Sequence, residues 1–231
     1  MMAAAPEVVL VLLAAGGLYL LGWWRLSRRT PAPAPRTRLA LALGGLASVA
    51  VALLSPLDAL AHRSFVAHML QHMLLVVVAA PASLLADPFP MVLWALPRPA
   101  RVHAGRWLRR ASPPGRAWRA LTAMPVTWLA YAALLWLWHL PPAYDAALSD
   151  RRLHDLEHLS FFLGAVLFWW PVILPAPRYR AAAPHALRIV YLVLGAFQTA
   201  ALGLLLTLAP TVLYRSYAAA VGPGSLDPLD A

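Results

Sequence analysis

Two histidine pairs are the residues of this chain best suited to metal chemistry. His68 and His72 occur in the stretch "HMLQHMLL", and His154 and His158 occur in "HDLEH". Side chains four residues apart project from the same face of a helix, about 5–6 Å from each other. Neutral imidazole binds copper, zinc, nickel and haem iron. Each pair is therefore a candidate half of a metal site, and hydrogen bonding between helices is the structural alternative.

Four further residues are candidate additions to this site. Met69 and Met73 lie roughly 100° round the helix from His68 and His72. Their thioether sulfurs favour cuprous copper, although methionine also simply fills space between helices. His62 and His139 lie near the same predicted helix ends. The chain has no cysteine, which excludes disulfides and thiolate sites.

The stretch "HDLEH" also matches H-x-x-E-H, the inverted zinc-peptidase signature. In that reading His154 and His158 bind zinc and Glu157 acts as the base. We find no convincing third ligand on a following helix, and the chain lacks a large soluble domain. We therefore expect no enzyme activity, and we expect Asp155 and Glu157 to orient the histidines or to attract cations.

The composition indicates which elements must position these residues. Hydrophobic residues make up 61% of the 231 residues and charged residues 12%. Soluble domains have about 45–50% and about 25%, respectively. The apolar runs are about 20 residues long, which suits membrane-spanning helices. We expect an all-α, polytopic transmembrane bundle of one domain (1–231), with spans at about 6–24, 38–56, 64–86, 122–140, 154–174 and 186–209.

The arginines predict the orientation of the bundle. All 19 basic residues are arginine, and most of them fall in the first, third and fifth loops. The positive-inside rule places those loops in the cytoplasm and the N-terminus outside. The segment 98–119, with Trp107 and Trp118, is then a cytoplasmic interfacial segment that contacts the lipid bilayer rather than nucleic acid. Six of the eight histidines map to the outer side: His62, His68, His72, His139, His154 and His158.

The two histidine pairs are predicted to face each other. The spans 64–86 and 154–174 both run from outside to inside, so the pairs lie at matching depth. The stretches "SPLDALAHRSFVAHMLQH" and "PPAYDAALSDRRLHDLEH" also share an order of proline, Asp-Ala, arginine and a histidine pair. This order indicates either an internal repeat of two helix hairpins or a coincidence.

Several stretches resemble the CtaG family of cytochrome c oxidase assembly factors, associated with caa-type oxidases. They are "HRSFVAHMLQHMLLVVVAAP", "WLWHLPPAYDAAL", "LHDLEHLSFFLGAVLFWWPV" and "AFQTAALGLLLTLAPTVLYRSYA". The resemblance implies a bacterial inner-membrane protein that helps to place copper in haem–copper oxidase subunits and receives it from extracytoplasmic carriers. The family's histidine motif falls on His62, His68 and His72, and its later histidines fall on His139, His154 and His158. The family has a seventh span where this sequence ends at "GSLDPLDA", so we expect six spans, from a short member or a truncated chain.

We therefore expect a copper-binding assembly factor whose histidines face the outer side. Three alternatives remain open. A haem-binding membrane cytochrome would use His72 and His158 as axial ligands. A zinc peptidase would use "HDLEH", and a transporter would line a path with Gln198, Thr199 and the histidines.

Overall fold

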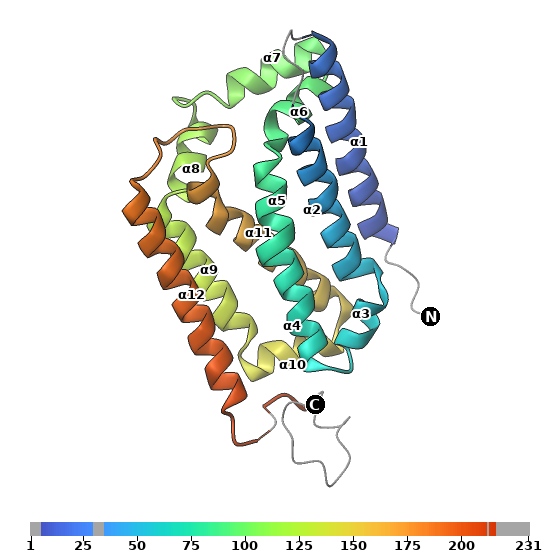
Figure 1. Cartoon of the computed structure of the whole chain (residues 1–231), viewed down its shortest axis with the longest axis vertical. Coiled ribbons are helices and arrows are strands. Elements are labelled where there is room, and N and C mark those ends of the chain that lie inside the picture. Colours follow the sequence, from blue (N-terminus) through green and yellow to red (C-terminus); the bar gives the residue numbers. More distant parts are fainter. Residues whose placement is uncertain (1–5, 30–34, 212, 216–231) are drawn as a thin grey trace.

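The protein is a bundle of helices, shown in Figure 1 as a computed structural model. The structure describes residues 6–29, 35–211 and 213–215, and no strand occurs in these ranges. The elements are α1 (Pro6–Arg29), α2 (Arg36–Leu54), α3 (Pro56–Ala61), α4 (Phe65–Met73), the π-helix η1 (Leu74–Ala79), α5 (Ala80–Leu85), α6 (Pro88–Ala95), α7 (Arg98–Trp107), α8 (Pro113–Leu121), α9 (Met124–Trp138), α10 (Pro141–Ser149), α11 (Arg151–Ile173) and α12 (His185–Thr207).

Five helical segments are long and apolar enough to cross a membrane. They are α1, α2, the continuous segment α4–η1–α5, α11 and α12, and α8 with α9 makes a sixth if this pair, bent by 63°, counts as one span. Large apolar side chains cover the outside of these helices, for example Phe197 at 71% exposure and Val193 at 58%. Such a surface suits lipid, because a helix satisfies its own backbone polar groups. The predicted all-α polytopic bundle is confirmed.

The first helix is longer than the predicted span 6–24. α1 continues through the arginines to Arg29. Cationic side chains in the last turn are favourable for the helix dipole, so the arginines extend the helix rather than end it. Arg25 also donates from Nη1 to the carbonyl oxygen of Ala95 at 2.6 Å, which joins α1 to the end of α6.

The fourth span and the segment before it differ from the predicted 122–140 and 98–119. The helix α9 covers only Met124–Trp138, and the arginine-rich segment forms two helices, α7 and α8. Pro125 lies in the first turn of α9, where a missing N–H is tolerated. The chain therefore breaks its helix at Thr122 and Ala123 and starts a new one at a sharp angle.

Pro81 is accommodated by the π-helical turn η1. In this register the N–H of Ala80 bonds to the carbonyl of Leu75, five residues earlier. The next carbonyl, that of Val76, would pair with residue 81, but proline has no N–H. The indole N–H of Trp169 donates to Val76 O instead, at 3.0 Å. At Pro81 the chain thus changes helix type locally, and a side chain of α11 stabilises the change.

Two short helices that were not predicted precede the histidine helices. α3 lies between α2 and α4, and α10 lies between α9 and α11. Side-chain caps start both histidine helices: Ser64 accepts from Ala67 N, and Asp150 accepts from Arg152 N. The two hairpins thus share the order of long helix, short helix and histidine helix. We call the end of the bundle where α3 and α10 lie the histidine end (Figure 1).

The opposite end, which carries α7 and the loop 174–184, is the arginine end (Figure 1). Asp87 holds the elements of the arginine end together. Its backbone is left-handed, with φ of 50°. Its carboxylate accepts from Ala176 N at 2.8 Å and lies 3.4 Å from Arg38 and 3.9 Å from Arg178. One carboxylate therefore ties α2 and the loop before α12 to the start of α6.

α11 is the central helix of the core. Phe161, Ala165 and Phe168 on this helix are buried, and they pack with Val76 of η1 and Tyr131 of α9. Directly on the histidine side of this cluster, Phe161 lies against the ring of His72, with centroids 4.5 Å apart. The histidine pairs thus lie next to the hydrophobic core.

Candidate metal centre

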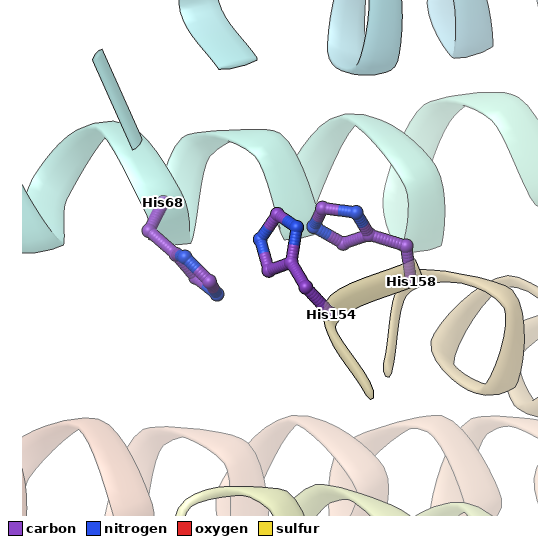
Figure 2. A group of neighbouring side chains, drawn as sticks. All are labelled: His68, His154 and His158. Carbon is purple, nitrogen blue, oxygen red and sulfur yellow. The ribbon is translucent and has the colours of Figure 1, made fainter. Parts of the chain in front are cut away.

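The structure brings the two predicted histidine pairs together, one from α4 and one from α11. The rings of His68 and His72 have centroids 4.3 Å apart, as do those of His154 and His158. Across the two helices, His72 lies 5.2 Å from His158, and His68 lies 5.5 Å from His154. Figure 2 shows His68 of α4 opposite His154 and His158 of α11. The four-residue spacing stacks each pair along its helix, and helix packing sets the pairs face to face.

These four imidazoles are buried. Their exposed fractions are 0% for His68, 4% for His72 and His154, and 3% for His158. Both ring nitrogens of His68 and His72, and Nε2 of His154 and His158, have no hydrogen-bond partner in the described part of the chain. Buried polar atoms nearly always have a partner. A set of converging ring nitrogens without hydrogen-bond partners fits a metal ion.

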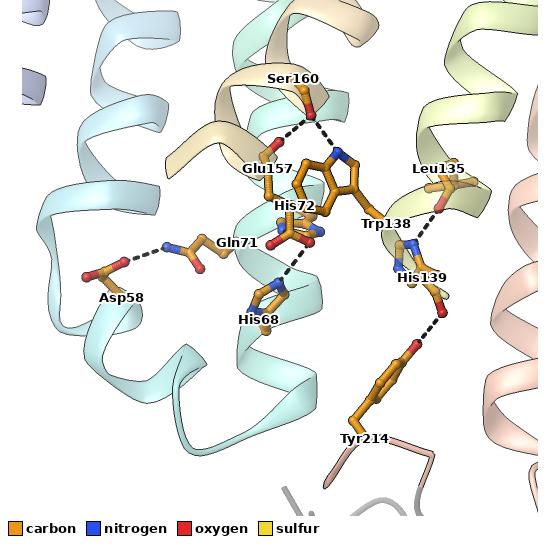
Figure 3. A network of polar contacts seen from close by, with 10 residues as sticks. All are labelled: Asp58, His68, Gln71, His72, Leu135, Trp138, His139, Glu157, Ser160 and Tyr214. Atoms are coloured by element: carbon orange, nitrogen blue, oxygen red, sulfur yellow. Dashed lines mark hydrogen bonds and ion pairs between the residues drawn. The ribbon is translucent and has the colours of Figure 1, made fainter. Parts of the chain in front are cut away.

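Glu157 completes the cluster from α11 (Figure 3). Its side chain is fully buried, and Oε1 lies 3.7 Å from His68 Nε2 and 3.8 Å from His72 Nε2. Both separations exceed a good hydrogen bond, so the carboxylate approaches the imidazoles without bonding to them. We call His68, His72, His154, His158 and Glu157 the histidine cluster. The sequence suggested an orienting role for Glu157, but the geometry places its oxygen among the candidate ligands.

The cluster contains two overlapping groups of three possible ligands. The first consists of His68, His154 and His158, and the second of His68, His72 and Glu157; within each group the ligand atoms lie within 4.8 Å of one another. An ion bound at about 2.0–2.1 Å by tetrahedral ligands needs them about 3.3 Å apart. To bind an ion, the ligand atoms of either group would therefore have to move closer together than the 4.8 Å limit within which they lie. His68 belongs to both, so the cluster offers more donors than one ion needs.

The other predicted ligands lie around the cluster rather than within these two groups. His62 is exposed, and its ring centroid is 4.9 Å from that of His154. His139 is buried with Nδ1 2.7 Å from the carbonyl oxygen of Leu135. Met73 is 40% exposed and so faces away from the buried rings. Met69 packs against Tyr144 and Tyr214 in a small core cluster.

Gln71 supports the cluster, and it was not among the residues predicted from the sequence. Its side chain is fully buried and donates from Nε2 to the carbonyl of Ala52 at 2.7 Å and to Asp58 Oδ1 at 3.0 Å. These bonds fix the rotation of α4 relative to α2 and α3, and hence the direction in which His68 and His72 point. The only sequence signal is an amide beside His72 on an otherwise apolar helix.

Fold and site together define a polytopic helical membrane protein with a buried histidine–carboxylate cluster near one end of the bundle. The family model described as cytochrome c oxidase caa3 assembly factor (Caa3_CtaG) matches residues 17–231, so the chain belongs to that family. The resemblance seen in the sequence is thereby confirmed. No curated protein and no solved structure matches the chain.

Proposed function

We propose that this assembly factor holds a copper ion in the histidine cluster and passes it to cytochrome c oxidase while that enzyme is assembled. The observation that carries the proposal is the convergence of four buried imidazoles and one buried carboxylate from α4 and α11. In this role copper is cargo. The surplus of donors suits a protein that must release its ion, because ligands can be exchanged one at a time.

The chemistry of the donors supports copper. The chain has no cysteine, so its strongest metal ligands are imidazole nitrogens. Among divalent first-row metals, copper binds such sites most tightly. The family assembles cytochrome c oxidase, and the resemblance implies that copper is the metal such a factor would place.

The arrangement of charge supports a site that faces the outer side. Arginine-rich α7 and α8 lie toward the end opposite the histidines (Figure 1). Under the positive-inside rule the arginine end is cytoplasmic, which leaves the histidine end outside. Extracytoplasmic carriers would then reach the cluster from its own side of the inner membrane.

The geometry favours a bare ion over haem. The rings of His72 and His158 are edge-to-face with centroids 5.2 Å apart, and Phe161 packs on His72. A porphyrin between two axial ligands needs a flat slot that these contacts fill. Full burial of Glu157 likewise disfavours a peptidase, whose base must meet water and substrate.

The polar residues proposed for a transport path have a structural role. Gln198 Oε1 accepts from Trp136 Nε1 at 3.0 Å, and Gln198 Nε2 donates to Thr199 Oγ1 at 3.1 Å. The first bond joins α9 to α12, as hydrogen bonds between membrane helices commonly do, and the second lies within α12. A protein that holds its ion in one place explains these hydrogen bonds, and no transport path through the bundle is needed.

Elemental analysis and an optical spectrum of the purified protein test the proposal. We expect bound copper without a haem spectrum. His72→Ala and His158→Ala should each lower bound copper by about tenfold or more, without preventing membrane insertion. His103→Ala, on exposed α7 at the arginine end, is the matched control and should leave the copper content unchanged. Unchanged copper in both cluster variants would refute the proposal.

A further inference from the structure

A groove of about 970 Å³ lies between α1 and α2 on one side and α11 on the other. Most of its wall is apolar, with leucines and valines of α1, α2 and α11. The charged residues and histidines of the wall gather where α1 and α11 begin and where α3 lies, at the histidine end. The groove therefore has a polar mouth and an apolar body.

The mouth carries more negative than positive charge. Its carboxylates are Glu7 of α1, Asp58 of α3 and Asp155 of α11, and its one guanidinium is that of Arg151. A cleft lined mainly by one sign of charge raises the local concentration of ions of the opposite sign. The mouth is therefore suited to collecting cations.

The same groove reaches the histidine cluster. His154 and His158 both line it. Their Nε2 atoms are buried, and neither finds a hydrogen-bond partner among the residues that the structure describes. A cation in the groove would thus lie beside two imidazoles whose Nε2 atoms bond to nothing in the described chain. This second observation distinguishes the mouth from an ordinary acidic surface.

His62 stands between the mouth and the cluster. It is exposed at the end of α3, and its ring centroid lies 4.9 Å from that of His154. Its Nδ1 is 2.8 Å from the carbonyl oxygen of Asp58. A carbonyl only accepts, so Nδ1 carries the proton and Nε2 keeps its lone pair for a metal. The ring centroid of His154 in turn lies 5.5 Å from that of His68, another member of the cluster.

We propose that His62 is the receiving ligand of a loading path that runs from the acidic mouth to His154 and then to the other histidines of the histidine cluster. The proposal rests on the proposed copper function and adds to it the side and the order of loading. Cuprous ion binds His62 Nε2 at the mouth, gains His154 as a ligand, and leaves His62 as His68 or His158 takes its place. On the protein these steps form and break only copper–nitrogen bonds: His154 adds to the ion, and His68 or His158 then replaces His62, so no electron is transferred.

Loading kinetics on the metal-free protein in lipid nanodiscs test the path. Cu(I) is offered as its bicinchoninate complex, and the loss of that colour follows transfer to the protein. We expect His62→Ala to slow loading by about tenfold or more while the final copper content stays at the wild-type value. His103→Ala is again the matched control and should load at the wild-type rate.

The absence of cysteine allows a second, reversible form of the test. In His62→Cys the new thiolate is a good ligand for cuprous copper, so loading should stay fast. A maleimide attached to that sulfur should then slow loading as His62→Ala does. Glu7→Gln combined with Asp155→Asn should also slow loading and make it less sensitive to salt.

The outcomes separate this path from the function on which it rests. If His62→Ala loads as fast as the wild type while His72→Ala fails to retain copper, the path is wrong and the function stands. If His62→Ala also lowers the final copper content, His62 is a ligand of the resting site, and the path is again wrong. If His72→Ala and His158→Ala retain copper, the proposed function itself fails.

Discussion

The indole N–H of Trp169 donates to the carbonyl oxygen of Val76 at 3.0 Å and so replaces the backbone partner that Pro81 removes. The contact links α11 to η1, immediately beyond the turn that carries His72. The change from α-helix to π-helix at this place determines how α4, the part of the third span that carries the histidines, packs against α11. The pairing of a proline on one helix with a tryptophan on another therefore helps to align the histidine cluster.

Trp169→Phe tests this pairing. The phenyl ring keeps most of the packing but leaves the Val76 carbonyl without its donor, so we expect a loss of about 1 kcal/mol in the free energy of unfolding. In a Pro81→Ala background the new N–H can serve the same carbonyl, and the loss should shrink to near zero. Reversible unfolding in mixed detergent micelles measures both.

Trp128→Phe is the matched control for that experiment. Trp128 packs against the same core, but its Nε1 has no hydrogen-bond partner within the described chain. Replacing it removes a similar ring without a hydrogen bond and should cost less than Trp169→Phe. Equal costs for the two variants, with or without Pro81, would mean that the Val76 contact does not stabilise the fold.

Gly22 is required where α1 crosses α6. A methyl group added at Gly22 would overlap the carbonyl oxygen of Met91, so the two helices must separate to accept alanine. We expect Gly22→Ala to lower the free energy of unfolding by about 1–3 kcal/mol. Gly17, on the same helix, meets no atom of the described residues within 4 Å of such a methyl group.

Gly17→Ala therefore serves as the control, and it should be neutral or stabilising by up to about 1 kcal/mol, because alanine favours a helix more than glycine does. Both variants can be compared by the same micelle unfolding. A Gly22→Ala protein as stable as Gly17→Ala would show that α1 and α6 adjust their distance freely.

The length and apolar character of the spans made the fold predictable from sequence. A helix that crosses a membrane needs about 20 apolar residues, and a run of that length can be recognised in the sequence however the helix packs. The breaks were harder to predict. The π-helical turn before Pro81 depends on Trp169, 88 positions further along the chain in the printed sequence, so no local pattern reveals it.

In the site, too, some features were predictable from the sequence and others were not. The spacing of His68 with His72 and of His154 with His158 was sufficient to predict that each pair lies on one face of its helix, because helical geometry alone decides this arrangement. The roles of Glu157 and Gln71 depend on the angle at which α4 meets α11 and α2. That angle is set by tertiary packing, so the sequence could suggest Glu157 only as a peptidase base, an orienting residue or an attractor of cations, and it did not indicate Gln71.

Asp87 should be more important to stability than the arginines around it. It combines a left-handed backbone, which asparagine and aspartate tolerate best among residues other than glycine, with the 2.8 Å bond from Ala176 N. We expect Asp87→Ala to lower the free energy of unfolding by about 2 kcal/mol and Asp87→Asn, which keeps both features, by less than about 1 kcal/mol. Arg178→Ala should change little, because Arg178 is 63% exposed at 3.9 Å. If Asp87→Asn and Asp87→Ala are equally destabilised in thermal unfolding, the charge rather than the backbone and the acceptor is what stabilises this end.

Glu157→Gln tests whether the buried carboxylate is a ligand or only a neighbour of the imidazoles. Glutamine keeps the volume of the side chain but removes the charge, and Oε1 of Glu157 lies within 3.8 Å of the Nε2 atoms of both His68 and His72. A carboxylate contributes more to a divalent ion than to a cuprous ion, which prefers softer ligands. We therefore expect the affinity for Cu(II) to fall by about tenfold or more and the affinity for Cu(I) to fall less. Competition titrations with chelators specific for each oxidation state measure the two affinities, and His103→Ala, on exposed α7 at the arginine end, is the control. An equal loss for both ions would mean that Glu157 holds the histidines in place, whereas a loss confined to Cu(II) identifies the carboxylate as a member of the coordination sphere.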